Sequence, residues 1–327
     1  MTEFKYRPVD VYDVKPIADM LRAHDTALFG MSNLWDSSVY ERLNGVDFEP
    51  ERSTLAAEAP DGTIAGFEAI YDTINPLRAD LWGHVSAPWR GQGVGSRLIE
   101  WAIERGSQNI AKAPPDAQVS ISAQVFAQDR DGKQLLTRYG FNYLRSFYTM
   151  KRDLSGEIAP TPLPDGFRLV SYAEKPDLRL YVTLEGDCFR DHWGWIDTPV
   201  EEDMERWQHY MEIAPDFDPN YWWLAFFGDE PAGLITTQLE SNVGDNVAWV
   251  LSLGVKREFR KRGLASAMLG HAFAAHQQRG AEAIALGVDA SSLTNAVALY
   301  EGAGMTVYAQ RDSYEKVLRE GIDLGTH

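Results

Sequence analysis

The chain has 327 residues, of which 44% are hydrophobic, enough for two domains that each bury a core. Its 48 acidic residues outnumber 31 basic ones, and the formal net charge of −17 excludes general affinity for nucleic acid, whose phosphates need lysine and arginine for neutralisation. The one cysteine, Cys188, excludes an intramolecular disulfide and lacks the Cys and His spacing of a zinc site, so we expect it to be buried and expect no metal.

The N-terminal sequence gives no targeting signal. Its first ten residues mix acidic, basic and proline side chains, and no later apolar run is long enough to span a bilayer. We therefore expect a cytoplasmic protein without a membrane partner. The acidity suits a cationic amine ligand, or alternatively serves only to keep the protein soluble.

The first half of the chain begins with a short strand at residues 4–9 and a helical segment. Two strands follow around the turn at Asp61-Gly62, and a further strand-like run ends at Val85. A turn rich in arginine and glycine comes next, at residues 90–95. Apolar residues then recur on one face of a helix, and residues 119–125 alternate as a strand does.

The second half repeats this order, with an offset of 170 residues from Arg90 to Arg260. A short strand at residues 167–171 and a helix precede two strands around the turn at residues 228–230, and the next strand ends at Val255 just before the second turn. The proline-rich segment between the halves reads as a linker. We predict domains at residues 1–154 and 167–327, joined by a linker at residues 155–166 that contains Pro160, Pro162 and Pro164.

A glycine-rich turn at a helix start is a candidate anion site. It exposes consecutive main-chain amides at the positive end of the helix dipole, which suits a pyrophosphate. Glycine permits close approach of the phosphate oxygens, and we expect Arg90 or Arg260 to add positive charge at the rim. One Arg-x-x-Gly-x-Gly/Ala match is a weak signal, but the preceding strand, the following helix and the repetition make it strong.

These motifs resemble the acetyl-CoA signature of the GNAT superfamily of N-acetyltransferases, Arg/Gln-x-x-Gly-x-Gly/Ala between the fourth strand and the third helix. The resemblance covers essentially the whole chain as a tandem pair, similar to the arrangement of mycothiol synthase. It implies an α/β (α+β) fold class with two tandem GNAT folds, each a mixed, mostly antiparallel sheet flanked by helices. It also implies acetyl-CoA as the co-substrate and direct acetyl transfer in a ternary complex.

The resemblance assigns roles to individual positions of the second half. The end of a splayed strand would hold the pantetheine arm, the turn would hold the pyrophosphate, and Asn295 would hydrogen-bond the arm. Tyr300 would lie near the sulfur and protonate the departing thiolate. The equivalent strand end and turn of the first half are candidates for a second cofactor site. The cofactor-binding residues assigned in this way are Leu253, Gly254, Val255, Arg260, Lys261, Arg262, Gly263, Leu264, Ala265 and Asn295, with Val85, Arg90, Gly91, Gln92, Gly93, Val94 and Gly95 in the first half.

The two halves are not equivalent. Aligning Gly140 with Gly304 places Leu136 where the second half has Tyr300, so the first half lacks the acid. We infer that the first domain is non-catalytic, and either binds acetyl-CoA or keeps a vestigial site as a scaffold. Tyr139, the neighbouring position, is an alternative source of the hydroxyl.

The general base is the most open assignment, because an amine with a pKa near 10 arrives protonated. Several relatives carry a glutamate on the fourth strand, whereas residues 246–252 contain no acid. Asp289, at the end of a strand, is the first candidate, although an aspartate there can equally cap a turn. His192 is the second candidate, within the aromatic segment 189–195, where the family places substrate-binding residues.

The same segment suggests how a substrate binds. Its rings, together with Asp191 and nearby Glu185, could grip a cationic substrate, or its two tryptophans could simply pack in the core. Tyr221, Trp222 and Trp223 are better explained as the start of a buried strand.

The expected activity is acetylation of the primary amine of a small molecule, such as an amino sugar, an aminoglycoside-like or nucleoside antibiotic, or an amino-acid derivative. One alternative is an acetyltransferase acting on a peptide N-terminus or on the amine of a thiol precursor. Another is a non-catalytic sensor or scaffold that only binds acetyl-CoA. Two similar halves can pack as an internal dimer, so we expect a monomer or a homodimer.

Overall fold

The computed structural model describes residues 2–30, 32, 34–45, 48–72, 77–156, 158, 161–195, 197–214, 216–292 and 295–325. The chain forms two compact units. Unit 1 comprises Met1–Phe147 and Gln310–Leu324, and unit 2 comprises Tyr148–Ala309 and Gly325–His327.

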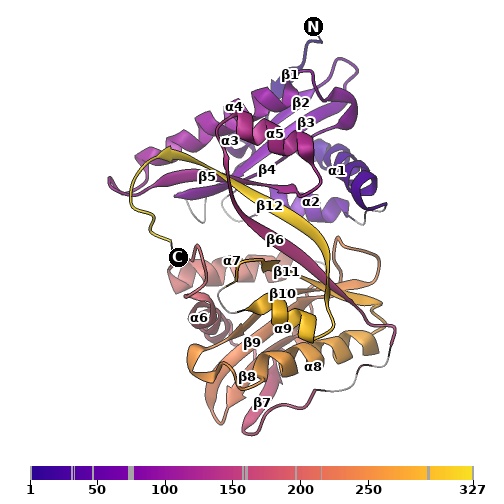
Figure 1. Cartoon of the computed structure of the whole chain (residues 1–327), viewed down its shortest axis with the longest axis vertical. Coiled ribbons are helices and arrows are strands. Elements are labelled where there is room, and N and C mark those ends of the chain that lie inside the picture. The colour runs from indigo at the N-terminus through magenta and orange to yellow at the C-terminus, as the bar shows by residue number, and fades with distance from the viewer. Residues whose placement is uncertain are drawn as a thin grey trace. The chain divides into compact units, whose positions relative to one another are not determined.

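Unit 1 contains a twisted sheet flanked by helices (Figure 1). Its strands are β1 (Lys5–Arg7), β2 (Thr54–Glu58), β3 (Ile64–Tyr71), β4 (Arg78–Val85), β5 (Val119–Phe126), the first part of β6 (Asn142–Asp153) and the last part of β12 (Thr306–Arg319). Its helices are α1 (Val14–Phe29), α2 (Asp36–Leu43), α3 (Pro50–Ser53), α4 (Val94–Ser107) and α5 (Arg130–Arg138), with short 3-10 turns at Val11–Asp13, Ala87–Trp89 and Gln108–Ala111.

Unit 2 repeats this plan. Its strands are the last part of β6, β7 (Phe167–Ser171), β8 (Trp222–Phe227), β9 (Glu230–Gln238), β10 (Val247–Val255), β11 (Ala283–Asp289) and the first part of β12. Its helices are α6 (Leu178–Phe189), α7 (Val200–Ile213), α8 (Leu264–Gln278) and α9 (Ala296–Gly302), with 3-10 turns at Pro219–Tyr221 and Arg257–Phe259. Trp222 and Trp223 are buried on β8, as expected, but Tyr221 belongs to the 3-10 turn before the strand and is only partly buried.

Strand order is the same in both units, and it confirms the mixed, mostly antiparallel sheets. In unit 1 the neighbours run β1-β2-β3-β4-β5-β12, and in unit 2 they run β7-β8-β9-β10-β11-β6. The pairs β4–β5 and β10–β11 are parallel, whereas the pairs β1–β2, β2–β3, β3–β4, β7–β8, β8–β9, β9–β10 and β5–β12 are antiparallel.

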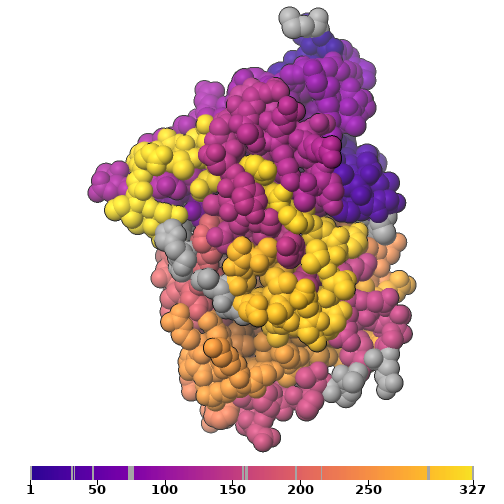
Figure 2. All heavy atoms as spheres, in the orientation of Figure 1, coloured from indigo at the N-terminus to yellow at the C-terminus, as the bar shows by residue number. Residues whose placement is uncertain are grey.

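The strands β6 and β12 are exchanged between the halves of the sequence. Residues Arg311 to Arg319 of β12 pair with β5 and complete the sheet of unit 1. In Figure 2 the yellow atoms of this C-terminal segment lie against the magenta atoms of unit 1. The end of β6 lies beside β11 in unit 2, where the Leu154 amide donates to the Glu282 carbonyl (2.8 Å).

The units therefore differ from the predicted contiguous domains, because residues 148–154 belong to unit 2 and residues 310–324 to unit 1. A strand pairs through its backbone, so its neighbour can come from any part of the chain, and local patterns do not reveal it. Of the predicted linker, Ile158 and Leu163 pack on the core of unit 2, and Pro160 lies outside the described residues.

Helices cover both faces of each sheet. In unit 1, Phe67 on β3 packs with Ile17 of α1, whereas Ile70 packs with Ile99 of α4. In unit 2, Ile235 on β9 belongs to the cluster under α8. Its neighbour Leu234 belongs to the cluster under α6 and α7. Alternate residues of a strand point to opposite faces, so each sheet is the middle layer of three. Within the described ranges, no helix combines the length and apolar character that a membrane crossing requires.

Candidate functional site

Two parallel strands diverge in each unit. In unit 2, β10 pairs with β11 from Val247 to Val250, but it continues beside β9 as far as Val255. A bulge between Val250 and Ser252 marks the point of divergence. In unit 1, β4 pairs with β5 only up to Leu81, although it also continues along β3. The last residues of β10 therefore present an unpaired main-chain edge to the gap between β10 and β11.

The two predicted turns have the same backbone conformation. Gly91 and Gly93 have φ of 75° and 90°, and their counterparts Lys261 and Gly263 have φ of 61° and 82°. Each turn leads directly into a long helix, α4 or α8, whose first amides have no acceptor inside the helix. A Cβ built at Gly91 or Gly93 would meet no heavy atom within 4 Å, so the space above that turn is open. Both turns have the geometry of an anion site.

The arginine of each turn folds back onto the strand before it. Arg260 Nε donates to the Val255 carbonyl (2.9 Å), and Arg90 Nε donates to the Val85 carbonyl (3.2 Å). Arg260 also binds the carboxylate of Asp191, which neutralises its charge. The expectation that Arg260 adds free positive charge at the rim of the turn is therefore wrong. Its guanidinium instead connects the turn to the strand end and to the loop after α6.

The other residues assigned to the turns divide into buried and exposed positions. Leu264 and Val94 are buried at the start of their helices. Gly95 packs against α5, because a Cβ there would lie 2.9 Å from Leu135 Cδ2, whereas the second turn has Ala265 at the equivalent position. The side chains of Gln92, Lys261 and Arg262 are exposed.

Tyr300 lies on α9, with 8% of its surface exposed, among the apolar residues under α8. Burial raises the pKa of its phenol to about 12. The Met305 amide donates to the Tyr300 carbonyl (3.0 Å), and the Phe141 amide donates to the Leu136 carbonyl (3.1 Å). This matching hydrogen bond supports the alignment of Leu136 with Tyr300.

Two further candidate residues, Asn295 and Tyr139, have clear positions. Asn295 precedes α9 in a left-handed conformation (φ 56°) and is exposed. In unit 1, the Tyr139 hydroxyl donates to Glu100 (2.8 Å) on the surface, so the structure gives it a different partner from the proposed thiolate.

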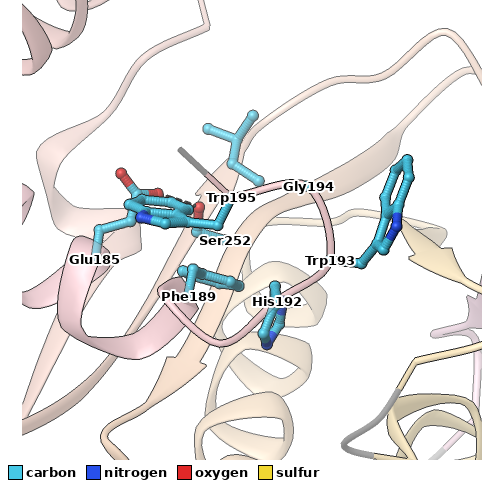
Figure 3. Close-up of a pocket in the computed structure, with 8 residues that line it drawn as sticks. Glu185, Phe189, His192, Trp193, Gly194, Trp195 and Ser252 are labelled. Carbon is cyan, nitrogen blue, oxygen red and sulfur yellow. Dashed lines mark hydrogen bonds between the residues drawn. The ribbon is translucent and has the colours of Figure 1, made fainter. Parts of the chain in front are cut away.

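A cavity of about 300 Å³ in unit 2 opens on β10 at the bulge (Figure 3). It lies between the end of α6, the loop that follows α6, and the strand. Its lining residues are Glu185, Phe189, His192, Trp193, Gly194, Trp195, Leu251 and Ser252. Leu251 and Ser252 directly precede the three β10 residues assigned to the pantetheine arm.

His192 lines this cavity, whereas Asp289 does not. The His192 amide donates to the Phe189 carbonyl (2.8 Å), and its ring meets the Phe189 ring edge-on at 4.8 Å. Burial lowers the pKa of His192, while the charges of Asp191 and Asp289 raise it. The imidazole is therefore neutral near pH 7. The Asp289 carboxylate accepts the Ser291 amide (2.8 Å), which is the turn-capping alternative.

Glu185 is the cavity residue that the catalytic assignments missed. Ser252 Oγ donates to Glu185 Oε1 (2.5 Å), and Trp207 Nε1 donates to Oε2 (2.9 Å). Burial raises the pKa of this carboxyl. Its position could have been inferred from the spacing of the helix. Glu185 follows Tyr181 by four residues, so both lie on the helix face that packs on the sheet.

Residues 181–305 match the family model described as the acetyltransferase (GNAT) family. This segment runs from α6 to the end of α9 and contains the cavity, the diverging strands and the second turn. The chain carries a GNAT acetyltransferase domain.

The whole chain also has GNAT relatives. A protein named mycothiol acetyltransferase from Thermobispora bispora is 26% identical over 249 residues, which cover 74% of this chain and 77% of the relative. The crystal structure of a GCN5-related N-acetyltransferase from Sphaerobacter thermophilus is 27% identical, has a TM-score of 0.82 and covers 98% of both chains.

A tandem GNAT protein from the clavulanic acid biosynthesis pathway shares the fold, with a TM-score of 0.71, 14% identity, and coverage of 98% of this chain and 100% of that one. The chain is thus an N-acetyltransferase built as two tandem GNAT folds, and GNAT acetyltransferases use acetyl-CoA. In the part of the chain that the structure describes, no three His, Cys, Asp or Glu side chains are grouped to hold a metal ion.

Proposed function

We propose that unit 2 transfers the acetyl group of acetyl-CoA directly to the primary amine of a small molecule, in a ternary complex. The observation that carries this proposal is the place of the cavity. It opens on Leu251 and Ser252 of β10, immediately before the segment where β10 has left β11 and leads into the turn at α8. An amine in the cavity would therefore lie next to a thioester held along the same strand.

The residues of unit 2 fit acetyl-CoA. The open edge at residues 253–255 would hydrogen-bond the pantetheine arm, the amides of residues 261–265 would hold the pyrophosphate, and Asn295 would bind the arm from the other side. Bound acetyl-CoA supplies the activated acyl thioester. A main-chain amide of the β10 edge would stabilise negative charge on the acyl oxygen without a charged side chain.

Tyr300 is proposed to assist the leaving sulfur. With a pKa of about 12, the phenol stays protonated at any working pH. Complete proton transfer to a thiolate is unfavourable, because an ordinary thiol has a pKa of about 8.5 and is the stronger acid. We therefore assign Tyr300 a hydrogen bond to the sulfur as charge develops there, which changes the full proton transfer expected from the sequence.

His192 is proposed to receive the proton of the amine, directly or through water. It is the candidate base that lines the cavity, and its lowered pKa keeps it neutral and able to accept a proton. Asp289 acts on His192 only through its charge, which raises the pKa of the imidazole.

Unit 1 is proposed to be non-catalytic. It has Leu136 in place of the tyrosine, and His84 on β4 occupies the place of Gly254 on β10. A Cβ at Gly254 would lie 2.6 Å from Cys188 Cβ, so α6 packs tightly against the strand there. In unit 1 the larger His84 packs against His24 of α1, with ring centroids 4.1 Å apart and the ring planes tilted by 47°.

Release of free thiol from acetyl-CoA with a panel of primary amines tests the activity. The panel includes the amine precursor of mycothiol, because relatives carry the name mycothiol acetyltransferase, and peptides with free N-termini. Calorimetric titration with acetyl-CoA counts the sites: one site is expected in unit 2, and a second would show that unit 1 still binds it. Tight acetyl-CoA binding without thiol release from any amine would favour the sensor or scaffold instead.

A further inference from the structure

We propose that Glu185 binds the ammonium group of the acceptor, so that the cavity selects small cationic amines. This inference rests on the proposed function and names the substrate class of that site. Three observations carry it: how the carboxylate is held, the charge it leaves unpaired, and the rings around it.

The carboxylate of Glu185 is held in place by neutral donors. Ser252 Oγ lies 2.5 Å from Oε1, Trp207 Nε1 lies 2.9 Å from Oε2, and the Tyr181 hydroxyl lies 3.3 Å from Oε1. These donors come from β10, α7 and α6, so three elements fix the group. A carboxylate held in this way is preorganised for a ligand.

The charge of Glu185 has no ion-pair partner among the residues that the structure describes. The charge of Arg206 is the smallest of the influences on its pKa, and the Arg206 guanidinium pairs with Asp203. A partly buried carboxylate without a cation is unfavourable, as its raised pKa shows. An incoming ammonium group would supply the missing opposite charge.

The walls of the cavity suit the rest of a cationic amine. Phe189 and Trp195 contribute rings, and Leu251 contributes an aliphatic surface, whereas the ring of Trp193 points away from Glu185. Figure 3 shows Trp195 beside the carboxyl of Glu185, and Phe189 between Glu185 and His192. Ring faces attract ammonium groups, and they also cover an apolar body. A volume of about 300 Å³ suits a small molecule.

Calorimetric titration of CoA-saturated protein with 2-phenylethylamine and 2-phenylethanol tests the site, because these probes differ in the ammonium group. We expect the amine to bind the wild type at least tenfold more tightly than the alcohol does, and Glu185→Gln to remove this difference. Asp187→Asn, on the same helix but facing Arg190, is the matched control and should bind like the wild type. Equal affinity of the wild type for both probes, or an unchanged preference in Glu185→Gln, would overturn the proposal.

A second variant separates charge recognition from a structural role. The Ser252 hydrogen bond lowers the pKa of Glu185, so Ser252→Ala should raise it. Amine binding is then lost on acidification at a higher pH than in the wild type. If Glu185 had only a structural role, Ser252→Ala and the wild type would show the same dependence of amine binding on pH.

Turnover distinguishes the two proposals. With an accepted amine, Glu185→Gln should raise KM for the amine at least tenfold and change kcat less. Turnover unaffected by Glu185→Gln would overturn this inference and leave the proposed function standing. Amine binding that depends on Glu185, without thiol release from any amine, would overturn the proposed function and leave this binding site.

Discussion

Asp191 and Arg260 join the loop that lines the cavity to the turn in front of α8. Arg260 donates to Asp191 Oδ1 (2.9 Å) and, through the same nitrogen, to the Cys188 carbonyl (2.9 Å). This hydrogen bonding holds the pKa of Asp191 well below its usual range. One arginine thus connects the proposed acceptor site to the proposed pyrophosphate site.

Asp191→Asn should lower the free energy of unfolding by about 1–2 kcal/mol at pH 7, since a charge-assisted pair with two contacts is lost at a partly exposed site. The folded-state pKa of Asp191 lies below the unfolded value of about 3.9. The stabilisation is therefore complete above the unfolded value, and it is lost progressively as the pH falls below that value towards the lower folded-state pKa. Urea unfolding at pH 7, 5 and 3.5 measures the effect. Asp187→Asn is the control, and a deficit that stays constant down to pH 3.5 would contradict the prediction.

Asp289→Asn should shift the acidic limb of the pH profile of kcat/KM to lower pH. The carboxylate raises the pKa of His192, so its removal lowers that pKa and preserves the neutral base in more acidic solution. Asparagine can still accept the Ser291 amide and keep the turn. Steady-state rates between pH 5 and 9 measure the shift. A shift of the acidic limb to higher pH would show that another group controls it.

Tyr300→Phe should reduce kcat about 10²-fold while leaving the affinity for acetyl-CoA unchanged. Phenylalanine fills the same apolar site, so the free energy of unfolding should change by less than about 1 kcal/mol. Thiol release and calorimetry measure the two quantities. Tyr139→Phe, which removes a hydroxyl bonded to Glu100, is the matched control. Retained kcat in Tyr300→Phe would remove this residue from the chemistry.

Removing the glycine at one turn and introducing a glycine at the equivalent position of the other should affect stability differently. Gly91→Ala should destabilise the protein by about 1 kcal/mol, because φ is 75° there and a Cβ is strained at positive φ. Lys261→Gly, at the equivalent position with φ 61°, should cause no loss of stability because it relieves the same strain. Thermal and urea unfolding compare the variants. A destabilised Lys261→Gly would mean that the lysine side chain stabilises the turn.

Cys188 should be unreactive toward thiol reagents in the native protein. It is 1% exposed, and burial raises its pKa to about 12, so almost no thiolate is present at pH 8. Labelling with a chromogenic disulfide should reveal one thiol only after denaturation. Rapid labelling of the native chain would show that α6 moves away from β10.

The parts predicted correctly from sequence depend on local chemistry. The turn at residues 90–95 and its repeat at residues 260–265 are set by nearest neighbours, and the apolar helix after each is readable from its period. The tandem GNAT fold and the acetyltransferase activity followed from that repetition. Leu136 as the replacement of Tyr300 also followed, because both precede a glycine at a fixed distance.

The parts that sequence reasoning missed depend on contacts between distant residues. The position of the Arg260 guanidinium is set by Asp191, 69 residues earlier, so its charge could not be assigned from the turn alone. Glu185 was expected near a cationic substrate, but its hydrogen bond to Ser252 depends on the packing of α6 beside β10, which the sequence does not show. The exchange of β6 and β12 depends on backbone pairing, to which side-chain patterns are nearly blind.

The pairing of β12 with β5 constrains the order of events during synthesis. The ribosome completes β5 at residue 126, but its partner, residues 311–319, emerges about 185 residues later. Until then β5 exposes an unpaired edge, which invites association with other nascent chains. The first half therefore cannot complete its sheet before the second half has been synthesised, and a chain interrupted after residue 309 should be found in inclusion bodies or bound to chaperones.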